Sequence, residues 1–197
     1  MSFSFNSHDN LEGTHAVLSA SQHYWLSYSD DRMREYFYSA LAKQRGTEMH
    51  AFAEQANKLG IKMPRNHITI NEFINDGLGY NMRSEVLLYF SPVAYGTADL
   101  IGFDEKKKIL RIFDLKTGKK DVLEFGQLHI YAALFCLEYN KNPEELTFDF
   151  RLYQNDLIRI EEDPDPSEIR EIMDKIIHFT EMIQDMRTEA KDNRYVY

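Results

Sequence analysis

The residues whose types and spacing are best suited to chemistry are Asp99, Asp114 and Lys116. Each lies in a run rich in β-branched and aromatic residues, and such runs, here 95–103 and 109–116, indicate β-strands. Because successive side chains of a strand point to opposite faces, Asp114 and Lys116 must share a face. The pattern therefore predicts a carboxylate and an ammonium group held side by side.

A hairpin between these two strands would bring the two carboxylates together. With a two-residue tip at Lys106-Lys107, Asp99 lies opposite Asp114 with their Cβ atoms about 5 Å apart. Carboxylates that close repel each other unless a cation or a proton lies between them. Three apolar residues would share that face: Ile101, Phe103 and Ile112. Charges bracketed by apolar residues are costly unless they are used, which favours a functional site over an exposed ion pair.

Two further segments carry candidate metal ligands. His50 and Glu54 are four residues apart in a helical pattern and share a helix face. A neutral imidazole is a good ligand for Mn²⁺ and is tolerated near Mg²⁺, which prefers oxygen. A helical histidine alone is more often structural, so that interpretation stays open. Glu85, at the start of a strand, is a further candidate ligand, and the sequence does not decide whether it or Glu54 faces the site.

Hydrophobic periodicity predicts the elements that must position these residues. A helix begins at the cap cluster 29–31 and runs to Gly60, with Gly46 as a candidate break. The other elements are expected, in order, as a helix over 71–78, strands over 85–90, 95–103 and 109–116, a helix over 123–138, strands over 148–153 and 157–160, and a helix that begins at Asp165. This order predicts an α/β (α+β) fold, a central mixed β-sheet flanked by helices.

Composition limits the classes of protein that the chain can belong to. The 197 residues show no linker or repeat, so we expect one domain over 1–197, with 1–15 as a loose arm. Cys136 is the only cysteine, which excludes an internal disulfide, a cysteine zinc site and an iron–sulfur cluster. No run is apolar enough to cross a bilayer, and the first residues do not resemble a signal peptide, so we expect a cytoplasmic protein without membrane contact.

Net charge is −9, but one segment is basic. Residues 104–120 hold seven basic side chains against three acidic ones. The seven are Lys106, Lys107, Lys108, Arg111, Lys116, Lys119 and Lys120. A basic patch on an acidic body suits a protein that contacts a polyanion at one place. A solvated lysine turn is the alternative.

Taken together, these pieces resemble the RecB and lambda-exonuclease branch of the PD-(D/E)XK nuclease superfamily. The resemblance covers about residues 18–139 and includes a likeness of 18–21 to the start of the family's N-terminal helix. Its four motifs match Gly46-Thr47-Glu48-Met49-His50, Gly96-Thr97-Ala98-Asp99, Asp114-Leu115-Lys116-Thr117-Gly118, and Gln127 with Tyr131. The single cysteine departs from the family members that carry an iron–sulfur cluster.

The resemblance implies a restriction-endonuclease-like core and a set of functional residues. The implied ligands for one or two Mg²⁺ or Mn²⁺ ions are His50, Asp99, Asp114 and the backbone carbonyl of Leu115. Lys116 is the implied catalytic lysine, and Gln127 and Tyr131 would brace the site or touch the strand. The expected activity is metal-dependent exonucleolytic cleavage of DNA in recombination, repair or phage replication. A structure-specific endonuclease and a catalytically silent DNA- or protein-binding module are the alternatives.

The partner expected from this resemblance is DNA, with a free end. A recombinase or single-strand annealing protein is a second candidate partner, and a homo-oligomer stays open. Two groups of lysines are expected to lie near the site and to contact phosphates: Lys106, Lys107 and Lys108 at the hairpin tip, and Lys119 and Lys120 after the strand 109–116. Weaker candidates for the DNA track lie near the N-terminus: Ser19, Ser21 and Arg45.

Overall fold

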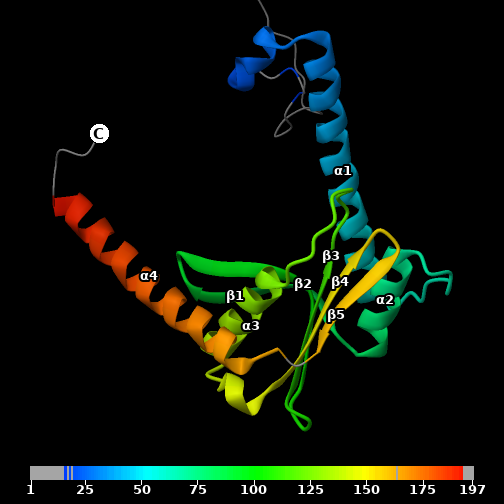
Figure 1. The fold of residues 1–197 in the computed structure, drawn as a ribbon. Helices are drawn as coiled ribbons and strands as arrows, with labels where there is room; N and C mark the ends of the chain where they lie inside the picture. The colour runs from blue at the N-terminus through cyan, green and yellow to red at the C-terminus, as the bar shows by residue number, and fades with distance from the viewer. Residues whose placement is uncertain (1–15, 17, 19, 163, 193–197) are drawn as a thin grey trace, which may run out of the picture. The chain divides into compact units, whose positions relative to one another are not determined.

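The computed structural model describes residues 16, 18, 20–162 and 164–192, with the side chains of 21–23 and 189–192 left out of the description. The expected loose arm over 1–15 lies outside the described residues, as does Ser19. Figure 1 shows the order of the elements along the chain. The helices are η2 (Ala20–Ser27), α1 (Asp30–Leu59), α2 (Thr69–Gly79), α3 (Gly126–Glu138), η3 (Pro143–Glu145) and α4 (Pro166–Asp192). The strands are β1 (Arg83–Ser91), β2 (Ala94–Asp104), β3 (Ile109–Leu115), β4 (Thr147–Gln154) and β5 (Leu157–Glu162).

The chain divides into two compact units, Met1–Thr47 and Glu48–Tyr197. The first unit contains η2 and most of α1, and the second contains the rest of α1 and all of the sheet. The helix α1 runs without interruption from Asp30 to Leu59, so the candidate break at Gly46 is wrong. The expectation of a single domain over 1–197 stays a prediction.

The second unit is built on one mixed β-sheet, which confirms the predicted α/β fold. Its strands lie in the order β1-β2-β3-β4-β5, and every neighbouring pair is antiparallel except β3 with β4. Parallel strands need a crossover connection, and α3 supplies it between β3 and β4. None of the helices in the described part of the chain is long and apolar enough to cross a membrane.

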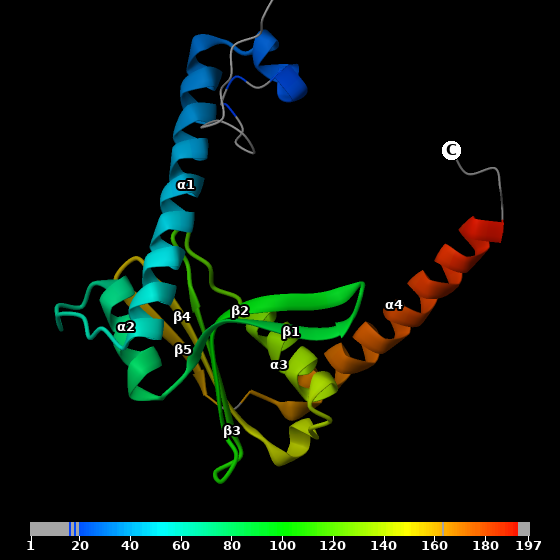
Figure 2. The ribbon, with the colours of Figure 1, turned by 180° about the vertical axis from the view of Figure 1, so that it is seen from behind.

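Two buried clusters hold helices on opposite faces of this sheet. On one face, α3 and α4 pack through Leu128, Leu134 and Ile169 onto strand residues such as Ile112. On the other face, α2 and the end of α1 pack onto Phe113 and its neighbours. Figure 2 shows this arrangement from behind, with α2 and α3 on different sides of the strands. Adjacent residues of β3 thus enter different clusters, as strand alternation requires.

The β2–β3 hairpin has the predicted register but a longer tip. Leu100 pairs with Phe113 and Asp104 with Ile109, so four residues, 105–108, form the turn instead of two. The carboxylate of Asp104 accepts hydrogen bonds from the backbone N–H groups of Lys106 and Lys107. Asp side chains favour turns in this way because they bond to backbone groups two or three residues on. These hydrogen bonds stabilise the four-residue turn in place of the expected two-residue tip.

Candidate functional site

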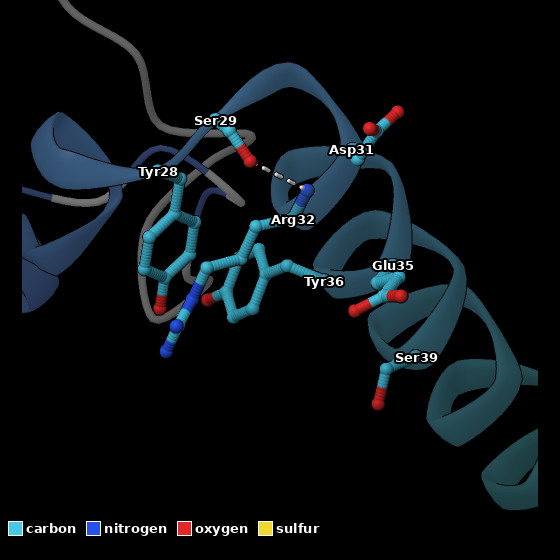
Figure 3. Close-up of a pocket in the computed structure, with 7 residues that line it drawn as sticks. All are labelled: Tyr28, Ser29, Asp31, Arg32, Glu35, Tyr36 and Ser39. Atoms are coloured by element: carbon cyan, nitrogen blue, oxygen red, sulfur yellow. Dashed lines mark hydrogen bonds between the residues drawn. The ribbon is translucent and has the colours of Figure 1, made fainter.

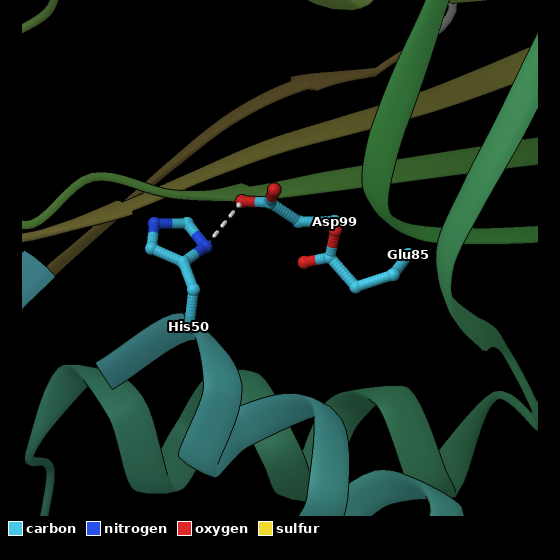
Figure 4. A group of neighbouring side chains, drawn as sticks. All are labelled: His50, Glu85 and Asp99. Carbon is cyan, nitrogen blue, oxygen red and sulfur yellow. Dashed lines mark ion pairs between the residues drawn. The ribbon is translucent and has the colours of Figure 1, made fainter. Parts of the chain in front are cut away.

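Three potential metal ligands from three elements meet in the second unit. They are His50 of α1, Glu85 of β1 and Asp99 of β2, and one ligand atom from each lies within 4.8 Å of the others. His50 Nδ1 is 3.5 Å from Asp99 Oδ2. Figure 4 shows the Glu85 carboxylate directed toward the same space as the other two side chains. The structure therefore places Glu85 at the site, which the sequence left undecided.

A local distortion of the β1–β2 hairpin brings these side chains together. Glu85 adopts φ 50°, a left-handed conformation that costs a non-glycine residue about 1–2 kcal/mol. The recorded strand pairing steps from Ser84–Leu100 to Val86–Ala98, so Glu85 and Asp99 occupy the intervening position. Ala98 packs with α3, whereas Leu100 packs in the cluster with α1 and α2, although the two are only two residues apart. The alternation of faces inverts at this point, and strain of this kind concentrates at functional sites.

Electrostatics at the cluster favour a proton or a cation. Burial, and next the charge of Asp114, raise the pKa of Asp99 to about 6, although the Leu115 N–H and His50 favour its anion. Desolvation and the neighbouring carboxylate of Glu54 likewise raise the pKa of Glu85 above its ordinary value. Glu54 itself forms an ion pair with Lys58 one helical turn further on. Carboxylates that repel one another in this way are a common preparation for binding a divalent ion.

The second half of the site contains Asp114 and Lys116. Asp114 is 2% exposed, and its Oδ2 lies 2.9 Å from Lys116 Nζ. The approach is an ion pair and not a directed hydrogen bond, since this buried oxygen has no hydrogen-bond partner among the described residues. Asp114 is not one of the three residues whose ligand atoms lie within 4.8 Å of each other, but its charge acts on Asp99. The predicted proximity of the ammonium to a carboxylate is confirmed.

Lys116 is held from the other side by a short chain of hydrogen bonds. Its Nζ donates to Gln127 Oε1 at 2.6 Å, and Gln127 Nε2 donates to the Tyr131 hydroxyl at 2.9 Å. Tyr131 packs closely over Gly96, where a Cβ atom would lie 3.0 Å from the ring. Because Gln127 and Tyr131 are four residues apart on α3, Tyr131 can hold the Gln127 amide that in turn binds the Lys116 ammonium group.

The backbone of β3 connects the two halves. The recorded β2–β3 pairing ends at Leu100–Phe113, and Asp99 and Asp114 are the next position in that register. There the Leu115 N–H donates a 2.9 Å hydrogen bond to Asp99 Oδ2. The carboxylate therefore takes the place of a strand partner at the end of β3. The role expected for the Leu115 carbonyl stays a prediction.

The segment after Lys116 is fixed by a residue that sequence reasoning missed. Gln154, at the end of β4, is 1% exposed, and its Nε2 donates to the carbonyls of Gly118 and Lys120 at 2.7 and 2.8 Å. Its Oε1 accepts a 2.8 Å hydrogen bond from the Val122 N–H. A glutamine at a strand end carries no signal in the sequence that it will bind a distant loop. The contacts restrain the backbone that carries Lys119 and Lys120.

The other expected DNA contacts are placed less favourably. Lys106, Lys107 and Lys108 are exposed in the hairpin tip, which precedes β3, whereas Lys116 follows that strand. Seven residues of strand separate the two ends by about 20 Å, so the expectation that the tip lies near the site is wrong.

The N-terminal candidates give no support to a DNA track. Arg45 is exposed and belongs to the first unit. Of Ser21 only the backbone is described.

A separate hollow lies in the first unit, where η2 leads into α1. Figure 3 shows Arg32 beside two aromatic rings, with the backbone N–H of Arg32 bonded to Ser29 Oγ at 3.3 Å. The guanidinium carbon of Arg32 lies 4.8 Å from the centre of the Tyr28 ring, which in turn meets Tyr36 edge-on at 5.7 Å. These contacts are typical of a helix start, with Ser29 as its cap.

The chain was also compared with known proteins. No family model, no curated protein and no solved structure matches it. The candidate site therefore rests on its residues and their geometry.

Proposed function

We propose that this chain is a metal-dependent deoxyribonuclease, and that it acts as an exonuclease on DNA. One observation carries the proposal: the cluster of His50, Glu85 and Asp99 adjoins an ammonium group that is held between Asp114 and Gln127. A ligand set beside a fixed cation suits a reaction in which negative charge develops on a phosphate. The motif resemblance to the PD-(D/E)XK superfamily supports the same reaction.

The residues present fit a divalent ion. An imidazole nitrogen and two carboxylates are a donor set that suits Mn²⁺ and, with water completing the shell, Mg²⁺. The buried Asp114 Oδ2, without a hydrogen bond among the described residues, is a further oxygen donor next to Asp99. We infer that His50, Asp99 and Glu85 hold one ion and that Asp114 contributes to it or to a second one.

The chemistry proposed is hydrolysis of a phosphodiester bond. The oxygen of water bonds to phosphorus, the bond from phosphorus to one ester oxygen breaks, and that oxygen takes up a proton. A divalent ion, when bound, offsets charge on the phosphate oxygens and lowers the pKa of an attacking water. Lys116 stabilises the charge that develops on the phosphate or orients the water, and Gln127 with Tyr131 restricts its ammonium group to that position.

A cleavage assay tests the proposal directly. End-labelled linear duplex, single-stranded and closed circular DNA are incubated with Mg²⁺, Mn²⁺ or EDTA. We expect cleavage of linear DNA that requires the metal and is abolished by Asp114→Asn, because the amide keeps the size of the side chain but not its charge. Asp185→Asn is the matched control, since Asp185 is exposed on α4.

The possible outcomes separate the alternatives. Cleavage of closed circular DNA would indicate an endonuclease on the same site. Undiminished cleavage by folded Asp114→Asn protein would contradict the site assignment. If the protein binds DNA but cleaves it with neither metal, it is a binding module and the proposed enzyme activity is wrong.

A further inference from the structure

An exposed aromatic pair lies on the hairpin that carries Glu85 and Asp99. Tyr89 of β1 and Tyr95 of β2 are paired across the strands, with ring centres 6.4 Å apart and ring planes inclined by 24°. They are 45% and 60% exposed. Two residues further along each strand, the next pair on the same face is Leu87, which is 54% exposed, with Thr97, which is also exposed. We call these four residues the tyrosine shelf.

The tyrosine shelf belongs to the same face of the hairpin as the candidate metal ligands. Leu88 and Ala98 are buried in the cluster that includes α3, so the odd-numbered residues between them point away from α3. Figure 1 shows α3 against one side of the β1–β2 hairpin only. At the inversion itself, the contact of Asp99 with His50 of α1 places Asp99 on the side away from α3, so the same face leads from Tyr89 and Tyr95 to the candidate ligands. Four residues of strand correspond to about 13 Å, or about four stacked nucleotides at 3.4 Å each.

The chemistry of the shelf suits unpaired nucleobases. Flat rings with a polar hydroxyl at the tip accept any base by stacking, which tightens binding by roughly fivefold to a hundredfold per base in proteins that bind single strands. The only ring contact recorded for either tyrosine among the described residues is with the other one. The four side chains expose roughly 300 Å², well short of the ~800 Å² per partner of a stable protein interface. A ligand that continues into the site is therefore favoured over a second copy of the chain.

We propose that the tyrosine shelf stacks the unpaired bases of the DNA strand whose phosphate enters the candidate metal site. The inference rests on the proposed function and deepens it, because it makes the substrate a single strand or a frayed end. A fully paired duplex hides the faces of its bases and gains nothing from the shelf.

The test measures binding without metal, so that cleavage plays no part. Fluorescence anisotropy in EDTA gives the affinity for a labelled oligothymidylate, for the same oligonucleotide with abasic sites, and for a blunt duplex. Tyr89→Ala/Tyr95→Ala is expected to bind oligothymidylate on the order of tenfold to a hundredfold more weakly. Its affinity for the abasic strand and the duplex should equal that of the wild type. The slope of log K against log salt should also stay the same, because stacking releases no counterions.

Matched variants exclude a loss of folding as the cause. Tyr139→Ala removes a tyrosine of similar exposure, 49%, from the end of α3, and should bind all three DNAs as the wild type does. Tyr95→Phe keeps a flat ring and should retain affinity for oligothymidylate. Tyr95→Leu keeps apolar area on the hairpin without a ring and should lose affinity, which preserves the test if the double variant does not fold.

The outcomes distinguish the shelf from the enzyme. If the protein cleaves DNA but the shelf variants bind oligothymidylate as the wild type does, the shelf is overturned and the proposed function stands. If no cleavage is found but wild type alone distinguishes oligothymidylate from abasic strand, the shelf stands as a binding site. If Tyr95→Ala converts a dimer to a monomer in light scattering without changing DNA affinity, the shelf is an interface between copies and the inference is wrong.

Discussion

At the scale of single residues, the candidate site is an accumulation of negative charge that folding alone does not favour. Asp99 lies against Asp114, and Glu85 lies against Glu54. His50 and Lys116 offset part of this charge. A fold that keeps acids this close gives up stability at neutral pH, which is typical of a site organised for a cation.

Asp99→Asn is expected to remove most of the pH dependence that this carboxyl imposes on the metal-free protein. The pKa of Asp99 is raised from 3.8 to about 6 in the folded protein, first by burial and then by Asp114. Between these values the folded state holds more protons than the unfolded state, so the free energy of unfolding falls as pH rises. The loss is complete above pH 6, and asparagine avoids it. Thermal melts in EDTA from pH 4 to pH 8 should decline less for the variant.

The same thermal melts, repeated with a divalent metal ion, test whether Asp99 binds that ion. Mn²⁺ or Mg²⁺ should raise the melting temperature of the wild type at pH 8 and leave that of Asp99→Asn nearly unchanged. Asp185→Asn should follow the wild type in every condition. Wild-type and Asp99→Asn curves that run parallel from pH 4 to pH 8 would show that Asp99 carries no raised pKa.

Lys116→Ala should lower turnover by about 10²–10⁴ while leaving metal binding in place, because in the proposed reaction the ammonium acts on the phosphate and does not bind the ion. The change removes the ion-pair partner of the buried Asp114 carboxylate, so a thermal melt must first show that the variant is folded. Single-turnover kinetics at saturating DNA and calorimetric titration with Mn²⁺ measure the two effects separately. A change in turnover below about fivefold would make Lys116 a structural ion-pair partner of Asp114.

At the scale of elements, the site depends on an inversion in the β1–β2 hairpin. The left-handed backbone of Glu85 sets its carboxylate beside Asp99, at the position where the strands change which helices they face. Hydrophobic packing on both sides keeps the strained residue in place, with Ala98 and Leu100 both fully buried. The conformation is therefore imposed on Glu85 by its neighbours.

Replacing Glu85 by glycine and by alanine should reverse the usual order of stability. Glycine in a strand normally costs about 0.5–1 kcal/mol relative to alanine. At φ 50° alanine is strained and glycine is not, so Glu85→Gly should be the more stable by about 1 kcal/mol. Urea unfolding in EDTA measures the difference. Leu87, two residues on along β1, is the control position, and there alanine should be the more stable.

At the scale of the whole molecule, the lysines around β3 form two separate groups. The chain carries −9 overall, and its lysines between 104 and 120 fall at the two ends of β3. Lys119 and Lys120 follow the candidate site in a loop that Gln154 restrains, whereas the hairpin tip lies about 20 Å away. Under the proposed function, Lys119 and Lys120 are therefore better placed than the hairpin tip to hold phosphates of a strand that enters the site.

Lys119→Ala/Lys120→Ala should weaken DNA binding and reduce the slope of log K against log salt by roughly 1.5 units, at about 0.7–0.9 per lost phosphate contact. Lys106→Ala/Lys107→Ala removes the same charge from the tip and should leave the slope unchanged. Binding titrations between 50 and 300 mM KCl compare the two variants. Equal slopes for both would place the DNA on another surface.

Local patterns in the sequence were enough to predict most of the elements and part of the site. Strand and helix periodicity depends on residues close in the chain. It was enough to predict the register of the β2–β3 hairpin, the side-by-side placement of Asp114 and Lys116, and the contact between Gln127 and Tyr131. The predicted two-residue tip was wrong, because the carboxylate of Asp104 accepts hydrogen bonds from the backbone of Lys106 and Lys107 and stabilises a longer turn. This turn also depends on residues close in the chain, but composition does not reveal its length.

Only the tertiary structure decided which distant groups complete the site. Strand alternation cannot predict that Glu85 turns toward Asp99, because the inversion arises from two helical layers packing on a bent hairpin. The binding of the loop after Lys116 by Gln154 likewise depends on how β4 lies in the sheet. Periodicity records which face a residue takes within one regular element, whereas contacts between elements are set by packing over the whole core.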